Sequence, residues 1–291
     1  MNSQFQFMQV INITPDSFSD GGKYNSYVGL KKRIEEAINW NTSYLDIGAQ
    51  STAPMNDPID ECEEINRFET YLLPALTSKL IPPNICLSID TYRPSVFEKV
   101  YKWIKEYLPH NQIIFNDVSG VLDQELIALM KKYSDFKYVY CHTGLKDRSL
   151  AGRHMNYVVD CQNGEIISIL RKHFQIALKE FEKYNFSNRV ILDPAFGFSK
   201  TMEQNLEIIK SLDTLLSELG QTWMLGISRK SFFKKMIQSQ ALESSNDIQK
   251  EYLHLATLCR WMNQITNQDI IIRGHDPSVF WSAHKITCWN F

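Results

Sequence analysis

Short apolar runs alternate along the chain with longer segments in which apolar residues are spaced by three and four. Eight runs rich in Ile, Val and Tyr occur, at residues 5–11, 43–48, 85–90, 113–117, 138–142, 189–193, 223–228 and 269–274. Most of them are continuously apolar rather than alternating, which is typical of strands buried on both faces of a sheet. The pattern therefore predicts eight buried strands.

The segments between these runs have the length and spacing of amphipathic helices. The clearest are residues 27–40, 125–133, 206–219 and 251–265. In the first we expect Val28, Ile34, Ala37 and Ile38 near one face, and in the second Leu126, Ile127 and Met130. Gly220 follows the third segment, where a glycine can end a helix in the left-handed conformation.

Regular alternation of strands and helices implies parallel strands joined by crossover helices. Eight repeats in 291 residues fit a closed (β/α)8 barrel, and no linker rich in Pro, Gly or Ser divides the chain. We therefore expect a single TIM-barrel domain over residues 1–291. A doubly wound open sheet is the alternative fold.

Every predicted strand ends in a polar residue. The residues at or just after the carboxyl ends are Asn12, Asp46, Asp90, Asn116, His142, Asp193, Ser228 with Lys230, and Arg273 with His275. One such residue is commonly only a turn or a helix cap, but in an α/β barrel these positions converge on the rim that carries active sites. The repetition at all eight strands indicates a functional site.

The residue types at these ends suit two neighbouring sub-sites. Asp90, Asn116, Asp193 and Lys230 could hydrogen-bond the donor and acceptor edge of a flat heterocycle. Asn12, Arg273, His275 and the backbone N–H groups of the polar loop after residue 12 suit a pyrophosphate with Mg²⁺, which prefers oxygen ligands.

Composition narrows the remaining classes of function. A net charge of −2 provides no electrostatic footprint for nucleic acid or for an anionic membrane. The six cysteines include no C-x-x-C pair, which favours buried thiols over a zinc site or a disulfide framework. No apolar run approaches the length of a bilayer span, and no secretory leader is evident, so we expect a cytoplasmic protein.

Seven motifs, in this order along the chain, resemble the signatures of the dihydropteroate synthase family. They are INITPDSFSDGG, LDIGAQSTAP, LSIDTY, FNDVSG, LDPAFGFSKTMEQNL, GISRKSF and RGHDP, and the similarity runs from about residue 8 to about residue 280. The first motif, the FGF segment and SRKSF are specific as a set. The resemblance implies a barrel enzyme of folate biosynthesis, a transferase.

The family's reaction joins 6-hydroxymethyl-7,8-dihydropterin diphosphate to p-aminobenzoate and releases pyrophosphate. By resemblance, the C–O bond to pyrophosphate breaks first, and the arylamine captures the cationic pterin methylene. The resemblance gives the pterin pocket to Asp90, Asn116, Asp193, Lys230 and Phe198, and the Mg²⁺ contact to Asn12. It gives pyrophosphate to Asn12, Thr52, Arg273 and His275, and p-aminobenzoate to Ser231, Phe18 and Pro54.

The stretch VINITPDSFSDGG is too long and too polar for a simple turn. By resemblance it is the first loop of these enzymes, which closes over the bound pyrophosphate, with Gly21 and Gly22 as its hinge. Asp16, Asp193 and Lys230 are the expected catalytic residues, because a cationic intermediate needs a nearby carboxylate, and Phe18 would shield it from water.

The second loop departs from the family pattern S-T-R-P-G. It reads Ser51-Thr52-Ala53-Pro54-Met55, so the arginine is missing. The available substitutes are Arg93, Lys146, Arg148 and Arg153, and we hypothesise that the last three, after the fifth strand, restore the charge. Ala195 and Ser199 also replace glycines of the FGF segment, changes we expect the fold to tolerate.

Two other functions stay open from the sequence. A pterin-dependent methyltransferase shares the barrel and the Asp-Asn-Asp pterin pocket, and Ala53 keeps open a pterin-binding paralogue with weak or no catalysis. By resemblance we also expect a homodimer and sensitivity to sulfonamides, which mimic p-aminobenzoate. The aromatic C-terminal segment, with Trp281 and Trp289, could supply an apolar contact.

Overall fold

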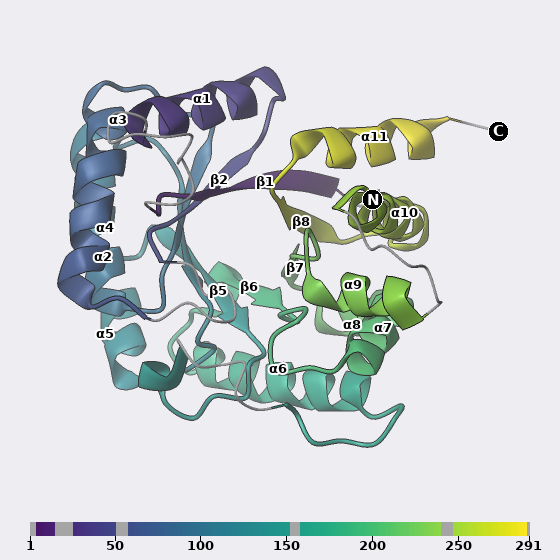
Figure 1. Cartoon of the computed structure of the whole chain (residues 1–291). Coiled ribbons are helices and arrows are strands. Elements are labelled where there is room, and N and C mark those ends of the chain that lie inside the picture. The colour runs from purple at the N-terminus through teal and green to yellow at the C-terminus, as the bar shows by residue number, and fades with distance from the viewer. Residues whose placement is uncertain (1–3, 15–25, 51–57, 152–157, 240–246, 290–291) are drawn as a thin grey trace. The chain divides into compact units, whose positions relative to one another are not determined.

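The structure is a computed structural model that describes residues 4–14, 26–50, 58–151, 158–239 and 247–289. Eight parallel strands form a closed barrel in the chain order β1 to β8, with helices between them (Figure 1). The predicted (β/α)8 barrel is therefore confirmed, and the open doubly wound sheet is wrong. By its internal contacts the chain divides into two compact units, so the expectation of one domain over residues 1–291 stays a prediction.

The N-terminal unit comprises residues 8–140 and 145–153. Its elements, of which β1 begins and β5 ends outside the unit, are β1 (Gln4–Asn12), α1 (Ser26–Asn39), β2 (Tyr44–Gly48), α2 (Glu61–Arg67), a π-helical turn (Phe68–Leu72), α3 (Leu73–Thr77), β3 (Cys86–Asp90), α4 (Pro94–Tyr107), β4 (Ile113–Asp117), α5 (Gln124–Lys132) and β5 (Phe136–Cys141). Stacked rings of Phe97 and Phe115, with centroids 4.4 Å apart, join α4 to β4.

The C-terminal unit comprises residues 1–7, 141–144 and 154–291. Its complete elements are α6 (Ile166–Glu182), a 3-10 turn (Ser187–Arg189), β6 (Val190–Asp193), α7 (Met202–Lys210), α8 (Leu212–Leu219), β7 (Thr222–Leu225), α9 (Ser231–Ser239), α10 (Asp247–Gln264), β8 (Asp269–Gly274) and α11 (Pro277–Cys288). Phe174 of α6 meets Trp223 of β7 edge to face, with ring centroids 5.3 Å apart. Helices α10 and α11 pack side by side.

Two helix predictions need correction, and two further expectations are confirmed. In α1 the buried residues are Leu30, Ile34 and Ala37, whereas Val28 is 60% exposed and Ile38 is 38% exposed, so the predicted face was partly wrong. The segment 206–219 is two helices, because Ser211 has a non-helical backbone between α7 and α8. The predicted buried face of α5 and the left-handed cap at Gly220, with φ 59°, are confirmed.

Strand β7 is shorter than predicted and ends at Leu225. The chain leaves the sheet there: the N–H of Lys230 donates to the carbonyl of Ile227, and Arg229 has a φ of 59°. This turn brings the SRK motif directly to the start of α9. The sequence therefore identified the strand correctly but extended it into a functional loop.

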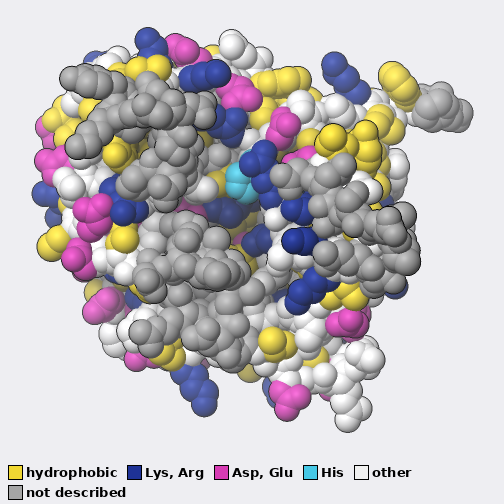
Figure 2. All heavy atoms as spheres, in the orientation of Figure 1, with side chains coloured by type: hydrophobic (Ala, Val, Ile, Leu, Met, Phe, Trp, Pro, Cys, Tyr) yellow, Lys and Arg dark blue, Asp and Glu magenta, His cyan; other side chains and the backbone are white. Residues whose placement is uncertain are grey.

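All six cysteines are free, as expected. Cys86 and Cys141 are buried, Cys161 and Cys259 are intermediate, and Cys62 and Cys288 are exposed, so the expectation of buried thiols holds for two of them. None of the described helices is both long and apolar enough to cross a membrane. On the face shown in Figure 2, acidic and basic side chains are interspersed.

Candidate active site

Strand register places one predicted group of site residues in a row. In the N-terminal unit Asn12 pairs with Gly48, Gly48 with Asp90, and Asp90 with Asn116 across strands β1 to β4. A Cβ on Gly48 would lie 3.2 Å from the Cβ of Asp90, so glycine leaves room for this carboxylate. Three of the predicted polar residues thus lie at one level at the ends of adjacent strands.

Asn116 is held from beneath by a residue to which we had assigned no role. Its Nδ2 donates to both carboxylate oxygens of Asp46, at 3.0 and 3.2 Å, and Ser88 Oγ donates to Asp46 Oδ1 at 2.6 Å. The side chains of Asp46 and Ser88 are fully buried, and that of Asn116 is nearly so. A charged residue inside the apolar strand at 43–48 was the available sequence signal.

Asp193, at the end of β6, is the centre of the second predicted group. It is buried, its Oδ1 accepts the N–H of Ala195 at 2.7 Å, and burial raises its pKa. Lys230 and Arg273 act electrostatically on this carboxylate and oppose the rise. The structure therefore brings together three predicted residues that are far apart in the sequence, within the C-terminal unit.

Lys230 also lies against the FGF segment. Its Nζ is 4.0 Å from the centroid of the Phe198 ring, a cation–π distance. Gly197, with a φ of 77°, leaves space for this arrangement, because a Cβ there would come within 3.2 Å of Lys230 Cδ. Two residues that the resemblance assigns to the pterin pocket, Lys230 and Phe198, are thus in direct contact.

Two of the residues predicted to bind pyrophosphate, Arg273 and His275, lie in the C-terminal unit. His275 Nδ1 lies 3.2 Å from Ser228 Oγ, and the backbone N–H of His275 donates to the same oxygen at 3.4 Å. Gly226 lies beside Arg273. Ser231 is exposed at the first residue of α9, where helix N–H groups favour an anion.

Lys200, the lysine of the FGFSK segment, was missed by the sequence analysis. Its Nζ donates to three carbonyl oxygens, of His142 at 2.9 Å, Phe198 at 3.1 Å and Ala195 at 3.3 Å. Burial lowers its pKa to about 7, against the raising effect of Asp193. Lys200 therefore ties the loop after β6 to the end of β5.

His142 lies under this loop and meets His173 of α6 edge to face, with ring centroids 4.6 Å apart. Burial lowers the pKa of His142 well below its ordinary value and that of His173 to about 4, and Lys200 adds to both effects. Both rings are therefore neutral at pH 7. His142, one of the strand-end candidates from the sequence, is therefore a neutral side chain packed against His173.

The two glycine replacements in the FGF segment are strained positions. Ala195 has a φ of 54° and Ser199 a φ of 53°, in the left-handed region where glycine is favoured. Such a residue costs about 1–2 kcal/mol relative to a right-handed one. The fold accommodates both changes, as expected, but at a conformational cost.

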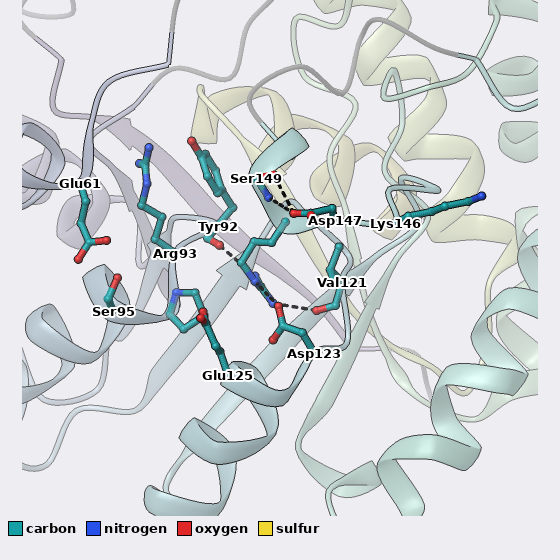
Figure 3. Close-up of a pocket in the computed structure, with 12 residues that line it drawn as sticks. Glu61, Tyr92, Arg93, Ser95, Val121, Asp123, Glu125, Lys146, Asp147 and Ser149 are labelled. Atoms are coloured by element: carbon teal, nitrogen blue, oxygen red, sulfur yellow. Dashed lines mark hydrogen bonds and ion pairs between the residues drawn. The ribbon is translucent and has the colours of Figure 1, made fainter.

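The hypothesis that Arg148 replaces the missing loop arginine is wrong. Its guanidinium pairs with Asp117 and with Asp123, and it also donates to Ser119 Oγ and to two backbone carbonyls, those of Tyr92 and Val121. Two of these partners, Asp123 and Val121, are labelled in Figure 3. All three of its guanidinium nitrogens donate hydrogen bonds within the N-terminal unit.

Arg93 is committed in the same way. It pairs with the buried carboxylate of Glu64 and donates to Gln50 Oε1 and to the carbonyl of Ile59. Burial raises the pKa of Glu64, although Thr91 and Arg93 oppose this. Two of its three guanidinium nitrogens, Nη1 and Nη2, are therefore used within the N-terminal unit, which argues against Arg93 as a substitute for the missing charge.

Lys146 remains as a substitute within the described residues. It is exposed, and together with both arginines it lines a pocket of about 500 Å³ in the N-terminal unit (Figure 3). The residues predicted to hold pterin do not line this pocket. Asp16, Phe18, Thr52, Ala53, Pro54 and Arg153 lie outside the described residues.

Comparison with known proteins gives the same assignment as the motifs. The family model described as "Pterin binding enzyme" matches residues 8–264. The chain is 32% identical to a dihydropteroate synthase of Clostridium beijerinckii, over 77% of this chain and 74% of the relative. It is 29% identical to one of Synechocystis, over 96% and 88% of the two chains.

The fold agrees as well. A crystal structure of a dihydropteroate synthase from Clostridium difficile, in the presence of pteroic acid, matches with a TM-score of 0.77 and 24% identity, over 98% of this chain and 95% of that chain. The family match, the relatives and the arrangement of polar residues at the strand ends lead to one conclusion. The chain belongs to the pterin-binding enzyme family.

Proposed function

We propose that this protein is a dihydropteroate synthase, which joins 6-hydroxymethyl-7,8-dihydropterin diphosphate to p-aminobenzoate and releases pyrophosphate. The observation that carries the proposal is the buried Asp193 carboxylate with Lys230 and Arg273 acting on it. This set supplies an acceptor for the pterin amino and ring N–H groups and cations for a departing diphosphate. The curated relatives named above carry the same enzyme name.

In the proposed reaction Asp193, Asp90 and Asn116 hold the pterin and Phe198 lies against its ring. A negative carboxylate at Asp193 stabilises positive charge on the pterin as the C–O bond to pyrophosphate breaks, a form of electrostatic catalysis. The burial that raises its pKa also strengthens this interaction. No protein nucleophile is needed, because the arylamine captures the cation.

The leaving group is proposed to bind Asn12, Thr52, Arg273 and His275, with Asp16 and Phe18 closing the site from the first loop. Ser231 at the start of α9, with Phe18 and Pro54, would hold p-aminobenzoate. Sulfonamides, as mimics of p-aminobenzoate, are then expected to inhibit.

Magnesium is the metal we propose for this site. Among the described residues, no group of three or more His, Cys, Asp or Glu side chains could hold a metal ion. A single asparagine oxygen suits Mg²⁺, which commonly uses one or two protein oxygens and completes its coordination with water and substrate phosphates. The Asn12 side-chain oxygen at the end of β1 is such a ligand, and the ion would neutralise charge on the leaving group.

A pyrophosphate-release assay with both substrates tests the function. We expect release only when the pterin diphosphate and p-aminobenzoate are both present with Mg²⁺. Asp193→Asn and Lys230→Met should each abolish most of the activity, whereas Asp213→Asn, an exposed site on α8, should not change it. Methyl transfer to a corrinoid protein, or pterin binding without release, would instead support one of the two alternatives.

We also propose that the chain works in the cytoplasm as a homodimer. The exposed apolar side chains on α11 and just after it, Ile286 and Trp289, are 38% and 65% exposed and could form part of a contact. Size-exclusion chromatography with light scattering should give a molar mass twice that of one chain. Trp289→Ser should leave that mass unchanged if the contact lies elsewhere.

A further inference from the structure

A buried polar cluster inside the barrel lies directly beneath one of the pterin residues. Asp46 of β2 and Ser88 of β3 are register partners, and Asn116 lies on the next strand at the level of Asp90. The carboxylate of Asp46 accepts from Ser88 Oγ and from Asn116 Nδ2. Its side chain has no exposed surface.

This contact fixes which end of the Asn116 amide faces the carboxylate. A carboxylate accepts hydrogen bonds and cannot donate them, so the NH2 group must turn towards Asp46. Turning the amide over would place its oxygen against two buried acceptor oxygens and would lose a charge-assisted hydrogen bond. Because the amide is planar, Oδ1 then points away from Asp46.

We propose that Asp46 is a positioning residue that makes Asn116 an obligate hydrogen-bond acceptor, and thereby selects a ligand edge with an N–H group at that place. The inference rests on the proposed function, because it takes Asn116 as a pterin contact. Asp46 does not touch the ligand and acts only through the amide. A contact one layer below the ligand therefore makes the site prefer a ligand that donates a hydrogen bond to Asn116 over one that accepts it.

The test replaces Asp46 by an isosteric residue that no longer fixes the amide. In Asp46→Asn, residue 46 can accept from or donate to Asn116, so both amide orientations become accessible. We expect the affinity for a ligand that presents an N–H group to Asn116 (a donor-edge ligand) to fall modestly. The affinity for a ligand that presents an acceptor there (an acceptor-edge ligand) should rise. The ratio of the two affinities should fall by about tenfold or more, the equivalent of one charge-assisted bond.

Two ligand pairs cover both edges of the ring system. 6-Hydroxymethyl-7,8-dihydropterin has an N8–H that oxidised 6-hydroxymethylpterin lacks, and 2,4-diamino-6-hydroxymethylpteridine presents an acceptor where pterin has N3–H. Calorimetric titration gives both ratios for each variant. A fall of about tenfold or more in at least one affinity ratio of Asp46→Asn, relative to the wild type, supports the proposal. A change of less than twofold in both ratios overturns it.

Ser88→Ala is the matched control. It removes another hydrogen bond to the same carboxylate at 2.6 Å without freeing the amide, so stability should fall while both ratios stay as in the wild type. A purely structural role of Asp46 predicts no difference in selectivity between the two variants.

A second variant carries the test if Asp46→Asn does not fold. The swap Asp46→Asn with Asn116→Asp keeps one amide and one carboxylate in the pair, with only acceptors at position 116, and should retain preference for donor edges. Loss of that preference in the swap overturns the proposal. Absent pyrophosphate release by the wild type would instead refute the proposed function, so the two failures are distinguishable.

Discussion

Replacing Arg148 by methionine should destabilise the N-terminal unit rather than weaken substrate binding. Arg148 holds the segment after β5 to the end of β4, through Asp117, and to the N-cap of α5, through Asp123. Only 11% of its side chain is exposed, and Asp117 is fully buried. Methionine keeps most of the side-chain volume but removes every donor.

The expected cost follows from what the substitution leaves behind. Asp117 would keep two partners, the hydroxyl of Tyr138 at 2.8 Å and the backbone N–H of Ser119 at 2.8 Å, but would lose its counter-charge. Breaking a buried ion pair from one side typically costs about 3–5 kcal/mol. That is a large part of the 5–15 kcal/mol that holds an ordinary protein folded.

Urea unfolding at pH 7 of four proteins measures this cost: the wild type, Arg148→Met, Asp117→Asn and the double variant. The double variant should lose less than the sum of the two single losses, because removing both charges leaves no unpaired ion. Lys183→Met, which breaks an exposed pair with Glu180, is the control and should cost less than about 1 kcal/mol.

Steady-state kinetics of Arg148→Met test whether Arg148 contacts a substrate or acts only on the stability of the fold. We expect KM for both substrates to stay within about twofold in Arg148→Met, under conditions where the variant is folded. A loss of less than 1 kcal/mol together with a tenfold rise in KM for an anionic substrate would refute the structural role.

Four further predictions concern the site and its surroundings. Ala53→Arg restores a guanidinium to the second loop and should raise kcat/KM by about one to two orders of magnitude, the equivalent of one charge-assisted bond, in the steady-state assay. Ala195→Gly and Ser199→Gly should each stabilise the fold by up to about 1–2 kcal/mol in urea unfolding, because glycine adopts a positive φ without strain. Lys200→Met removes a cation that lowers the pKa of Asp193, so the acid limb of the pH profile of kcat/KM should move to higher pH, whereas exposed Lys172→Met should not move it. The pKa of His173 falls from an ordinary 6.5 to about 4 in the folded protein, so the free energy of unfolding decreases as the pH drops from 6.5 towards 4. In His173→Phe, the decrease between pH 6.5 and pH 5 should be smaller by about 2 kcal/mol in urea unfolding.

The strand pattern was readable from the sequence because parallel barrel strands are buried on both faces and are therefore continuously apolar. All eight runs became strands. The errors fell where short-range spacing does not decide burial. Val28 and Ile38 have the spacing of a buried face, but α1 turns them outward and buries Leu30 instead.

The partners of charged residues could not be predicted from the sequence. Arg148 meets Asp117 and Asp123 across 31 and 25 positions, and only folded geometry shows that its donors are used. The roles of Asp46, which was only noted as a strand-end residue, and Lys200, which was missed, could not be predicted for the same reason, since each acts through residues on other elements. Their sequence signals, an acid inside a buried strand and a lysine two positions after FGF, become informative only once their contacts are known.

The placement of positive charge explains why Ala53 matters. In the N-terminal unit, Arg93 pairs with Glu64, and Arg148 pairs with Asp117 and Asp123, so carboxylates of the protein already balance both positive charges. In the C-terminal unit, by contrast, Lys230 and Arg273 act on the site carboxylate itself. A leaving diphosphate would therefore draw its protein charge mainly from the second set. A guanidinium at position 53 would then add a new interaction rather than duplicate one, which is why its effect on kcat/KM should be measurable.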